Sequence, residues 1–285
     1  MKILLTGGKG QVGSEFTEYV EQNPELGVEL LITDLHNLDI SNRDQVRATV
    51  AEFEPQWIVH LAALTAVDLC EDQVDLAFSV NAIGTRNLVQ AADAVGAKVC
   101  YISTDYVFDG ESSTPYREWD TPNPKSVYGK SKLAGELEVR PTDLIIRTSW
   151  VMGKYGSNIL KTMIRLARGE GEVKFVGDQI GSPTVVSDLI RTIVDLITRD
   201  QSGLFHACNE GSLSWFELCR FVFQEVGADP NRVVEISSDQ LDSSRKAPRP
   251  KYSVLDNMAI RLTKSKPLPN YRDSVAALVR TLLEG

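Results

Sequence analysis

Short apolar runs alternate with amphipathic stretches of helical length over the first half of the chain, and this pattern leaves few folds open to it. The apolar runs KILLT, VELLITD, WIVHLAA, KVCYIS and DLIIRTSW are rich in Ile, Val and Leu, as expected of strands that helices cover on both faces. Segments such as QVGSEFTEYVEQ, SNRDQVRATVAEF and DLAFSVNAIGTRNLVQAADAVG separate them. This order predicts an α/β fold with a doubly wound parallel sheet of the Rossmann type.

A glycine-rich segment, TGGKGQVG, follows the first expected strand directly. Its Gly7, Gly10 and Gly13 form a G-x-x-G-x-x-G pattern, which permits a tight turn and a close approach of the backbone to a pyrophosphate. The helix that follows would point its free N–H groups and the positive end of its dipole at that anion. A purely structural turn is the alternative, but the position between strand and helix favours a dinucleotide cofactor.

Two charged residues give opposite indications about which cofactor this is. Asp34 ends the second expected strand, where a carboxylate can bind the adenosine ribose and would repel the 2′-phosphate of NADP. Lys9, within the glycine-rich segment, would attract that phosphate. The sequence therefore predicts NADH or NADPH, with a slight preference for NADH and with use of both left open.

The segment SVYGKSKLAGE places Tyr128 and Lys132 four positions apart, so they share one face if residues 126–139 are helical. An ammonium near a phenol lowers its pKa, and a phenol can protonate a carbonyl oxygen while a nicotinamide delivers hydride to carbon. Thr104 ends another apolar run, at the sheet edge where such folds bind ligands. Taken singly, the pair fits an exposed helix surface and Thr104 fits a turn, but together they indicate catalysis.

Charge and composition exclude several other classes of protein. The net charge is −9 and no Lys/Arg-rich run is present, which argues against a nucleic-acid or anionic-membrane partner. The four cysteines and three histidines are dispersed, so we expect free thiols, a reducing compartment and no metal site. No apolar run is long enough to span a bilayer, and the first expected strand leaves no room for a targeting segment. A cytoplasmic protein is the expectation.

The strand–helix alternation loosens after about residue 150. The segments GDQIGSPT and SSRKAPRPKYS read as long loops between helices such as SWFELCRFVFQEVG and YRDSVAALVRTLLEG. We expect a dinucleotide-binding domain over residues 1–150. A smaller α+β domain over 151–285 would mainly bind substrate, with some of its segments returning to the Rossmann sheet.

The segments TGGKGQVG, STDYVFDG and YGKSK together resemble the extended short-chain dehydrogenase/reductase superfamily. Longer segments, in order along most of the chain, are similar to its dTDP-4-dehydrorhamnose reductase family: HLAALTAVDLCEDQVDLAFSVNA, STDYVFDGESSTPYREWDTPNPKSVYGKSKLAGE, IIRTSWVMG, DQIGSPT and APRPKYSVLDN.

This resemblance implies roles for individual residues. Thr104, Tyr128 and Lys132 would be catalytic, and Lys132 would also hold the nicotinamide ribose. The substrate would contact Thr104, Tyr106 and Trp150, although Trp150 also fits a core residue at a strand end. The expected cofactor site comprises Gly7, Gly10, Gln11, Val12, Gly13, Asp34, Asp39, Ile40, Ala62, Ala63, Leu64, Thr65, Ile102, Tyr128 and Lys132.

The triplet Thr104-Asp105-Tyr106 favours reduction over the other reactions of this superfamily. Relatives that dehydrate a nucleotide sugar have glutamate where this chain has Tyr106, and they use both acids for elimination. The resemblance thus implies reduction of dTDP-4-dehydro-L-rhamnose to dTDP-L-rhamnose, the last step of dTDP-rhamnose synthesis. The alternatives are reduction of another dTDP-4-keto-6-deoxysugar, or a non-catalytic role like that of the regulatory subunit of methionine adenosyltransferase. Some members of the family dimerise, so a homodimer is a further expectation.

Overall fold

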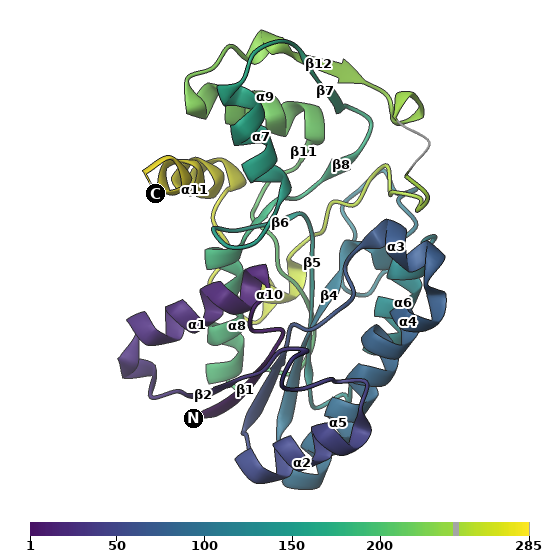
Figure 1. Ribbon diagram of the computed structural model, residues 1–285, viewed down its shortest axis with the longest axis vertical. Coiled ribbons are helices and arrows are strands. Elements are labelled where there is room, and N and C mark those ends of the chain that lie inside the picture. The colour runs from purple at the N-terminus through teal and green to yellow at the C-terminus, as the bar shows by residue number, and fades with distance from the viewer. Residues whose placement is uncertain (242–244, 285) are drawn as a thin grey trace.

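The computed structural model describes residues 1–241 and 245–284. Its centre is a six-stranded sheet in the order β10-β5-β4-β3-β1-β2, and every neighbouring pair is parallel. The predicted doubly wound parallel sheet is confirmed (Figure 1). The strands are β1 (Lys2–Thr6), β2 (Glu29–Ile32), β3 (Trp57–His60), β4 (Lys98–Thr104), β5 (Leu144–Thr148) and β10 (Gly203–His206).

Helices cover both faces of this sheet because successive strand residues point to opposite sides. In β1, Ile3 and Leu5 pack in a core with α1 (Gln11–Gln22) and α8 (Val186–Thr198). Leu4, between them, packs in a second core with α2 (Arg43–Phe53) and α5 (Gly84–Val95). Figure 1 shows α1 and α8 on one side of the sheet and α2 and α5 on the other.

The later part of the chain builds a third core above the carboxyl ends of the strands (Figure 1). Its helices are α7 (Ile159–Arg168), α9 (Trp215–Val226) and α11 (Tyr271–Glu284). Short strands pair as β6 (Val151–Met152) with β9 (Thr184–Val185), β8 (Ile180–Gly181) with β11 (Leu213–Ser214), and β7 (Val173–Val176) with β12 (Val233–Ile236). From this part, β10 joins the central sheet and α10 (Met258–Leu262) packs on β10. The division at residue 150 stays a prediction.

Some expected boundaries are wrong. The amphipathic stretch over 75–96 is helical without a break up to Val95, but one turn, at Ser79–Ile83 between α4 (Val74–Phe78) and α5, is π-helical. Asp34 lies two residues beyond the end of β2, and GDQIGSPT contains β8 rather than loop alone. Residues 243 and 244 of SSRKAPRPKYS lie outside the described residues. The remaining elements are α3 (Val67–Asp72), α6 (Val127–Glu136) and the 3-10 turns at Pro24–Leu26, Asp105–Val107, Pro230–Arg232 and Ser238–Gln240.

None of the helices in the described part of the chain has the length and apolar character needed to cross a membrane. The four cysteines are buried and free. Over the same residues, no three or more His, Cys, Asp or Glu side chains are grouped so that they could hold a metal ion.

Candidate active site

A cavity of about 1480 Å³ lies at the carboxyl ends of the central strands, between the sheet and the third core. It is lined by glycine-rich-loop residues after β1, by residues after β2, β3, β4 and β5, and by α6 and α7. Every residue that the sequence assigned to the site lines this cavity: Gly7, Gly10, Gln11, Val12, Gly13, Asp34, Asp39, Ile40, Ala62, Ala63, Leu64, Thr65, Ile102, Thr104, Tyr106, Tyr128, Lys132 and Trp150.

The glycine-rich loop forms the turn between β1 and α1 that the sequence predicts. Gly7 has a φ of +68° and lies so close to the chain after β3 that a Cβ would be 2.7 Å from the backbone nitrogen of Ala62. A Cβ on Gly13 would overlap the carbonyl oxygen of Gly7. The loop therefore forms a narrow cradle at the start of α1, which suits a pyrophosphate.

Replacing Gly13 with Ala should weaken NADP⁺ binding by about 10-fold or more. The new Cβ would overlap the carbonyl oxygen of Gly7, so the backbone that forms the cradle must move to make room for it. Isothermal titration calorimetry measures this change. Gly169→Ala is the matched control, since a Cβ there meets its nearest heavy atom at an ordinary 3.5 Å. An unchanged dissociation constant in Gly13→Ala would show that the cofactor does not use this cradle.

Asp34 closes the glycine-rich loop from the end of the second strand. Its Oδ2 accepts a hydrogen bond from the backbone N–H of Lys9 at 2.9 Å, and its Oδ1 accepts one from the N–H of Leu35 at 2.8 Å. Both Asp34 and Lys9 line the cavity. The carboxylate and the ammonium thus lie in the same region, and the opposite indications they give about a 2′-phosphate persist in the structure.

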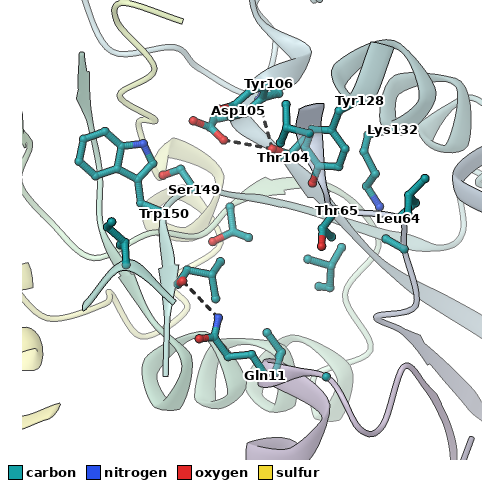
Figure 2. Close-up of a pocket in the computed structure, with 18 of the residues that line it drawn as sticks. Gln11, Leu64, Thr65, Thr104, Asp105, Tyr106, Tyr128, Lys132, Ser149 and Trp150 are labelled. Carbon is teal, nitrogen blue, oxygen red and sulfur yellow. Dashed lines mark hydrogen bonds between the residues drawn. The ribbon is translucent and has the colours of Figure 1, made fainter. Parts of the chain in front are cut away.

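Tyr128 and Lys132 enter the cavity from α6, beside Thr104 at the end of β4 (Figure 2). The Ser126 side chain caps α6 by accepting a hydrogen bond from the N–H of Gly129 at 3.1 Å. Lys132 is buried, and its Nζ lies 4.0 Å from the centroid of the Tyr101 ring. The alternative of an exposed Tyr/Lys pair is therefore wrong. The helix ends at Glu136, three residues earlier than expected.

The pKa of Tyr128 is raised on balance, so the lowering that the sequence predicts from Lys132 does not dominate. Burial raises the pKa of Tyr128 above its usual value, and Thr104 counteracts only part of this shift. Burial lowers the pKa of Lys132 to about 7, although Glu136 opposes the change. Removal from water penalises phenolate and ammonium alike, which accounts for both directions. Tyr128 stays protonated at neutral pH.

Trp150 follows β5 directly and lies at the other end of the cavity (Figure 2). Its ring stacks on that of Trp215, with 3.5 Å between centroids and 9° between planes. Tyr106 meets Tyr128 edge-on, with 5.5 Å between ring centroids. Arg249 also lines the cavity, and both of its terminal nitrogens donate to the carboxylate of Asp68 at 2.6 Å.

Comparison with known proteins identifies the family. A family model described as RmlD substrate binding domain matches residues 1–284. The chain belongs to this family. The spore coat polysaccharide biosynthesis protein SpsK of Bacillus subtilis is 38% identical over 93% of this chain and 93% of that protein. A dTDP-4-dehydrorhamnose reductase of Streptomyces griseus is 40% identical over 94% of this chain and 90% of that protein.

A solved structure agrees with these relatives. The dTDP-4-dehydrorhamnose reductase of Bacillus anthracis in complex with NADP has a TM-score of 0.92 and 41% sequence identity, and the match covers 98% of this chain and 99% of that one. The resemblance drawn from the sequence motifs is therefore confirmed.

Sequence reasoning missed several residues that shape the site in this RmlD-family chain. Asn81, in the π-helical turn, exchanges two hydrogen bonds with the backbone of Leu64, and its Nδ2 also donates to Ser131 at 2.9 Å. It thereby joins the loop after β3 to α6. An asparagine within an apolar helical stretch is the signal that could have indicated it. The pairing of Trp215 with Trp150 has no such local signal.

Asp105 is a further polar group beside the candidate catalytic residues. It is 2% exposed, and its Oδ1 accepts a hydrogen bond from the Thr104 hydroxyl at 3.1 Å. Its Oδ2 has no hydrogen-bond partner among the described residues. Burial raises the pKa of Asp105 to about 6, so this carboxyl group gains a charge inside the protein as the pH rises through that value.

The Asp105→Asn variant should show a weaker loss of stability with rising pH. The folded-state pKa of about 6 exceeds the unfolded value, which is about 4. The folded state then binds the proton more tightly than the unfolded state. The contribution of Asp105 to the free energy of unfolding therefore falls by up to about 3 kcal/mol as the pH rises from 4 to 6. Urea unfolding at several pH values measures the difference between variant and wild type. Parallel pH profiles for the two proteins would contradict this account.

Proposed function

We propose that this protein reduces dTDP-4-dehydro-L-rhamnose to dTDP-L-rhamnose with NADH or NADPH, as the last step of dTDP-rhamnose synthesis. The observation that carries the proposal is one cavity that combines the glycine-rich cradle with Thr104, Tyr128 and Lys132. Full-length relatives named dTDP-4-dehydrorhamnose reductase support it. The cradle fits a dinucleotide, because added Cβ atoms would fill the space against the backbone there.

Tyr128 acts in this proposal as the proton donor to the C4 oxygen of the sugar. A bound nicotinamide cofactor supplies the hydride. An ordinary tyrosine, with a pKa of about 10, is protonated at neutral pH, and Tyr128, whose pKa burial raises, is too; this is the state that a donor requires. Thr104, beside the phenol (Figure 2), would hydrogen-bond the same oxygen, and Lys132 would bind the nicotinamide ribose.

Tyr106 supports reduction rather than dehydration. Elimination of water by a related site uses two acids in the triplet that here reads Thr104-Asp105-Tyr106. Residue 106 is a tyrosine whose pKa burial raises above its usual value, so it is no substitute for a carboxylate that accepts a proton. Asp105 alone leaves the acid pair incomplete.

The proposal extends to the cofactor and to the cellular location. The Bacillus anthracis relative was solved with NADP, which supports NADPH, whereas Asp34 beside the glycine-rich loop supports NADH. We infer that the cavity accepts both. The buried free cysteines support a reducing, cytoplasmic compartment, and a homodimer stays a prediction.

Oxidation of NADH and NADPH, followed in parallel with dTDP-4-dehydro-L-rhamnose, tests this function. We expect rapid oxidation of at least one cofactor and formation of dTDP-L-rhamnose. Activity only on a different dTDP-4-keto-6-deoxysugar would change the substrate assignment and keep the reaction. Cofactor binding without oxidation of either, together with co-elution with a methionine adenosyltransferase, would favour the regulatory alternative.

A further inference from the structure

Gln11, the first residue of α1, joins the cofactor loop to a segment far along the chain. Among the described residues its side-chain amide makes three hydrogen bonds, all of them to residues 151–158 (Figure 2 shows one). Nε2 donates to the carbonyl oxygen of Val151 at 3.2 Å. Oε1 accepts from the N–H of Gly153 at 3.1 Å and from Nδ2 of Asn158 at 2.6 Å. Contact with a pyrophosphate through the backbone requires none of these bonds.

Asn158 extends this connection into the wall of the cavity. Its Nδ2 also donates to the carbonyl oxygen of Gly153 at 2.7 Å, and its Oδ1 caps α7 by accepting from the N–H of Lys161 at 3.1 Å. Ile159 and Thr162, in the first turns of α7, line the cavity. The amide of Gln11 therefore forms hydrogen bonds with both ends of the segment 151–158, which precedes α7.

The other end of the segment begins at Trp150, whose backbone is in an unfavourable conformation. Its φ is +46°, which is rare for a bulky residue and persists only where the surroundings enforce it. Its carbonyl oxygen accepts a hydrogen bond from the N–H of Thr184 at 3.2 Å. Its ring stacks on that of Trp215 and lies close to Gly181, where an added Cβ would be 2.5 Å from the indole. The bond from Gln11 fixes Val151, the very next residue.

We propose that the Gln11 side chain is a positioning residue that couples the two halves of the site. A cofactor bound in the glycine-rich cradle fixes the start of α1. The hydrogen bonds of Gln11 then hold residues 151–158 in place. Trp150 and α7, which flank these residues, are thereby positioned to bind the sugar nucleotide. Bound cofactor thereby tightens sugar-nucleotide binding, and the reverse holds by the same factor. The identity of the second ligand rests on the proposed function; the connection itself does not.

Titration calorimetry of Gln11→Met tests the coupling, with NADP⁺ and dTDP-L-rhamnose added singly and together. In the wild type we expect NADP⁺ to tighten dTDP-L-rhamnose binding by about 10-fold, within the usual range for coupled sites. In Gln11→Met this factor should fall to about 1; because it is the ratio of the dissociation constants of dTDP-L-rhamnose without and with NADP⁺, a change in the affinity for NADP⁺ alone does not alter it. Gln22→Met is the matched control, because the Gln22 side chain on the same helix bonds only to Glu18 among the described residues.

A second variant separates this role from general destabilisation. Asn158→Asp keeps the oxygen that caps α7 but removes Nδ2, which donates to Gln11 and to the carbonyl oxygen of Gly153. We expect it to lose the coupling as Gln11→Met does, with thermal unfolding close to that of the wild type. A coupling factor that survives in Gln11→Met, or that falls equally in Gln22→Met, would overturn the proposal.

Circular dichroism provides a readout that needs no sugar nucleotide. Two stacked indoles such as Trp150 and Trp215 give an exciton couplet, which should change when NADP⁺ binds to the wild type and stay constant in Gln11→Met. If NADP⁺ changes the couplet of the wild type but not that of Gln11→Met, and dTDP-L-rhamnose does not bind, the coupling stands and the proposed substrate is wrong. A couplet that is unaffected by NADP⁺ in the wild type would contradict the coupling itself.

Discussion

The Tyr128→Phe variant is expected to reduce dTDP-4-dehydro-L-rhamnose with a kcat lower by about 100-fold or more, the usual contribution of a general acid. The phenol lines the cavity beside Thr104 and is protonated at neutral pH, as a tyrosine of ordinary or raised pKa is. Phenylalanine keeps the ring and its packing but removes the proton. Steady-state kinetics measures the loss, and calorimetry should show NADP⁺ binding within about threefold of the wild type.

Tyr106→Phe is the matched control for this variant. Tyr106 lines the same cavity, and its ring contacts that of Tyr128 edge-on at 5.5 Å. Loss of its hydroxyl group should change KM more than kcat and should lower kcat by less than about 10-fold, since it donates no proton in the reaction. If Tyr128→Phe keeps most of its turnover, or if the two variants are equally impaired in kcat, Tyr128 is not the proton donor.

The second large effect is on stability. Replacing Glu136 with Gln should lower the free energy of unfolding by about 3–5 kcal/mol, the usual cost of removing one partner from a buried ion pair. Glu136 accepts two hydrogen bonds from Arg147, at 2.8 and 2.6 Å, and one from Ser103 at 2.5 Å. Glu136 and Arg147 are almost completely buried. The variant leaves the guanidinium without a counter-charge, and it removes the carboxylate that opposes the pKa decrease of Lys132. Denaturant unfolding measures the change.

Glu138→Gln is a close control for this prediction. Glu138 lies two residues further along and also accepts two hydrogen bonds from one arginine, Arg86, at 2.9 and 2.7 Å. That pair is exposed to solvent, where ion pairs contribute little. A loss in Glu136→Gln as small as that in Glu138→Gln would show that the buried network does not stabilise the fold.

The parts of the molecule that the sequence predicts are those set by local pattern. Strand and helix periods specify the parallel sheet, and the glycine spacing specifies the turn after β1. The four-residue spacing of Tyr128 and Lys132 places both on one face of α6. Because the carboxyl ends of parallel strands meet at one edge of a sheet, Thr104, the last residue of β4, lies in the same cavity.

What the sequence does not predict depends on contacts between distant segments. The pKa of Tyr128 is raised by burial, which outweighs the effect of the neighbouring lysine that the spacing suggests. The stack of Trp150 on Trp215, and the bonds of Gln11 to residues 151–158, join segments that no local pattern relates. The π-helical turn at Asn81 lies within a stretch whose periodicity indicates one α-helix.

Isotope transfer from the cofactor tests the central claim most directly. The protein is incubated with dTDP-4-dehydro-L-rhamnose and NADPH, or NADH, deuterated at the transferable position, and the product is analysed by mass spectrometry and NMR. The account predicts dTDP-L-rhamnose with one deuterium on C4 and one cofactor oxidised per sugar. A product without deuterium, deuterium at another carbon, or cofactor that is not consumed would contradict it.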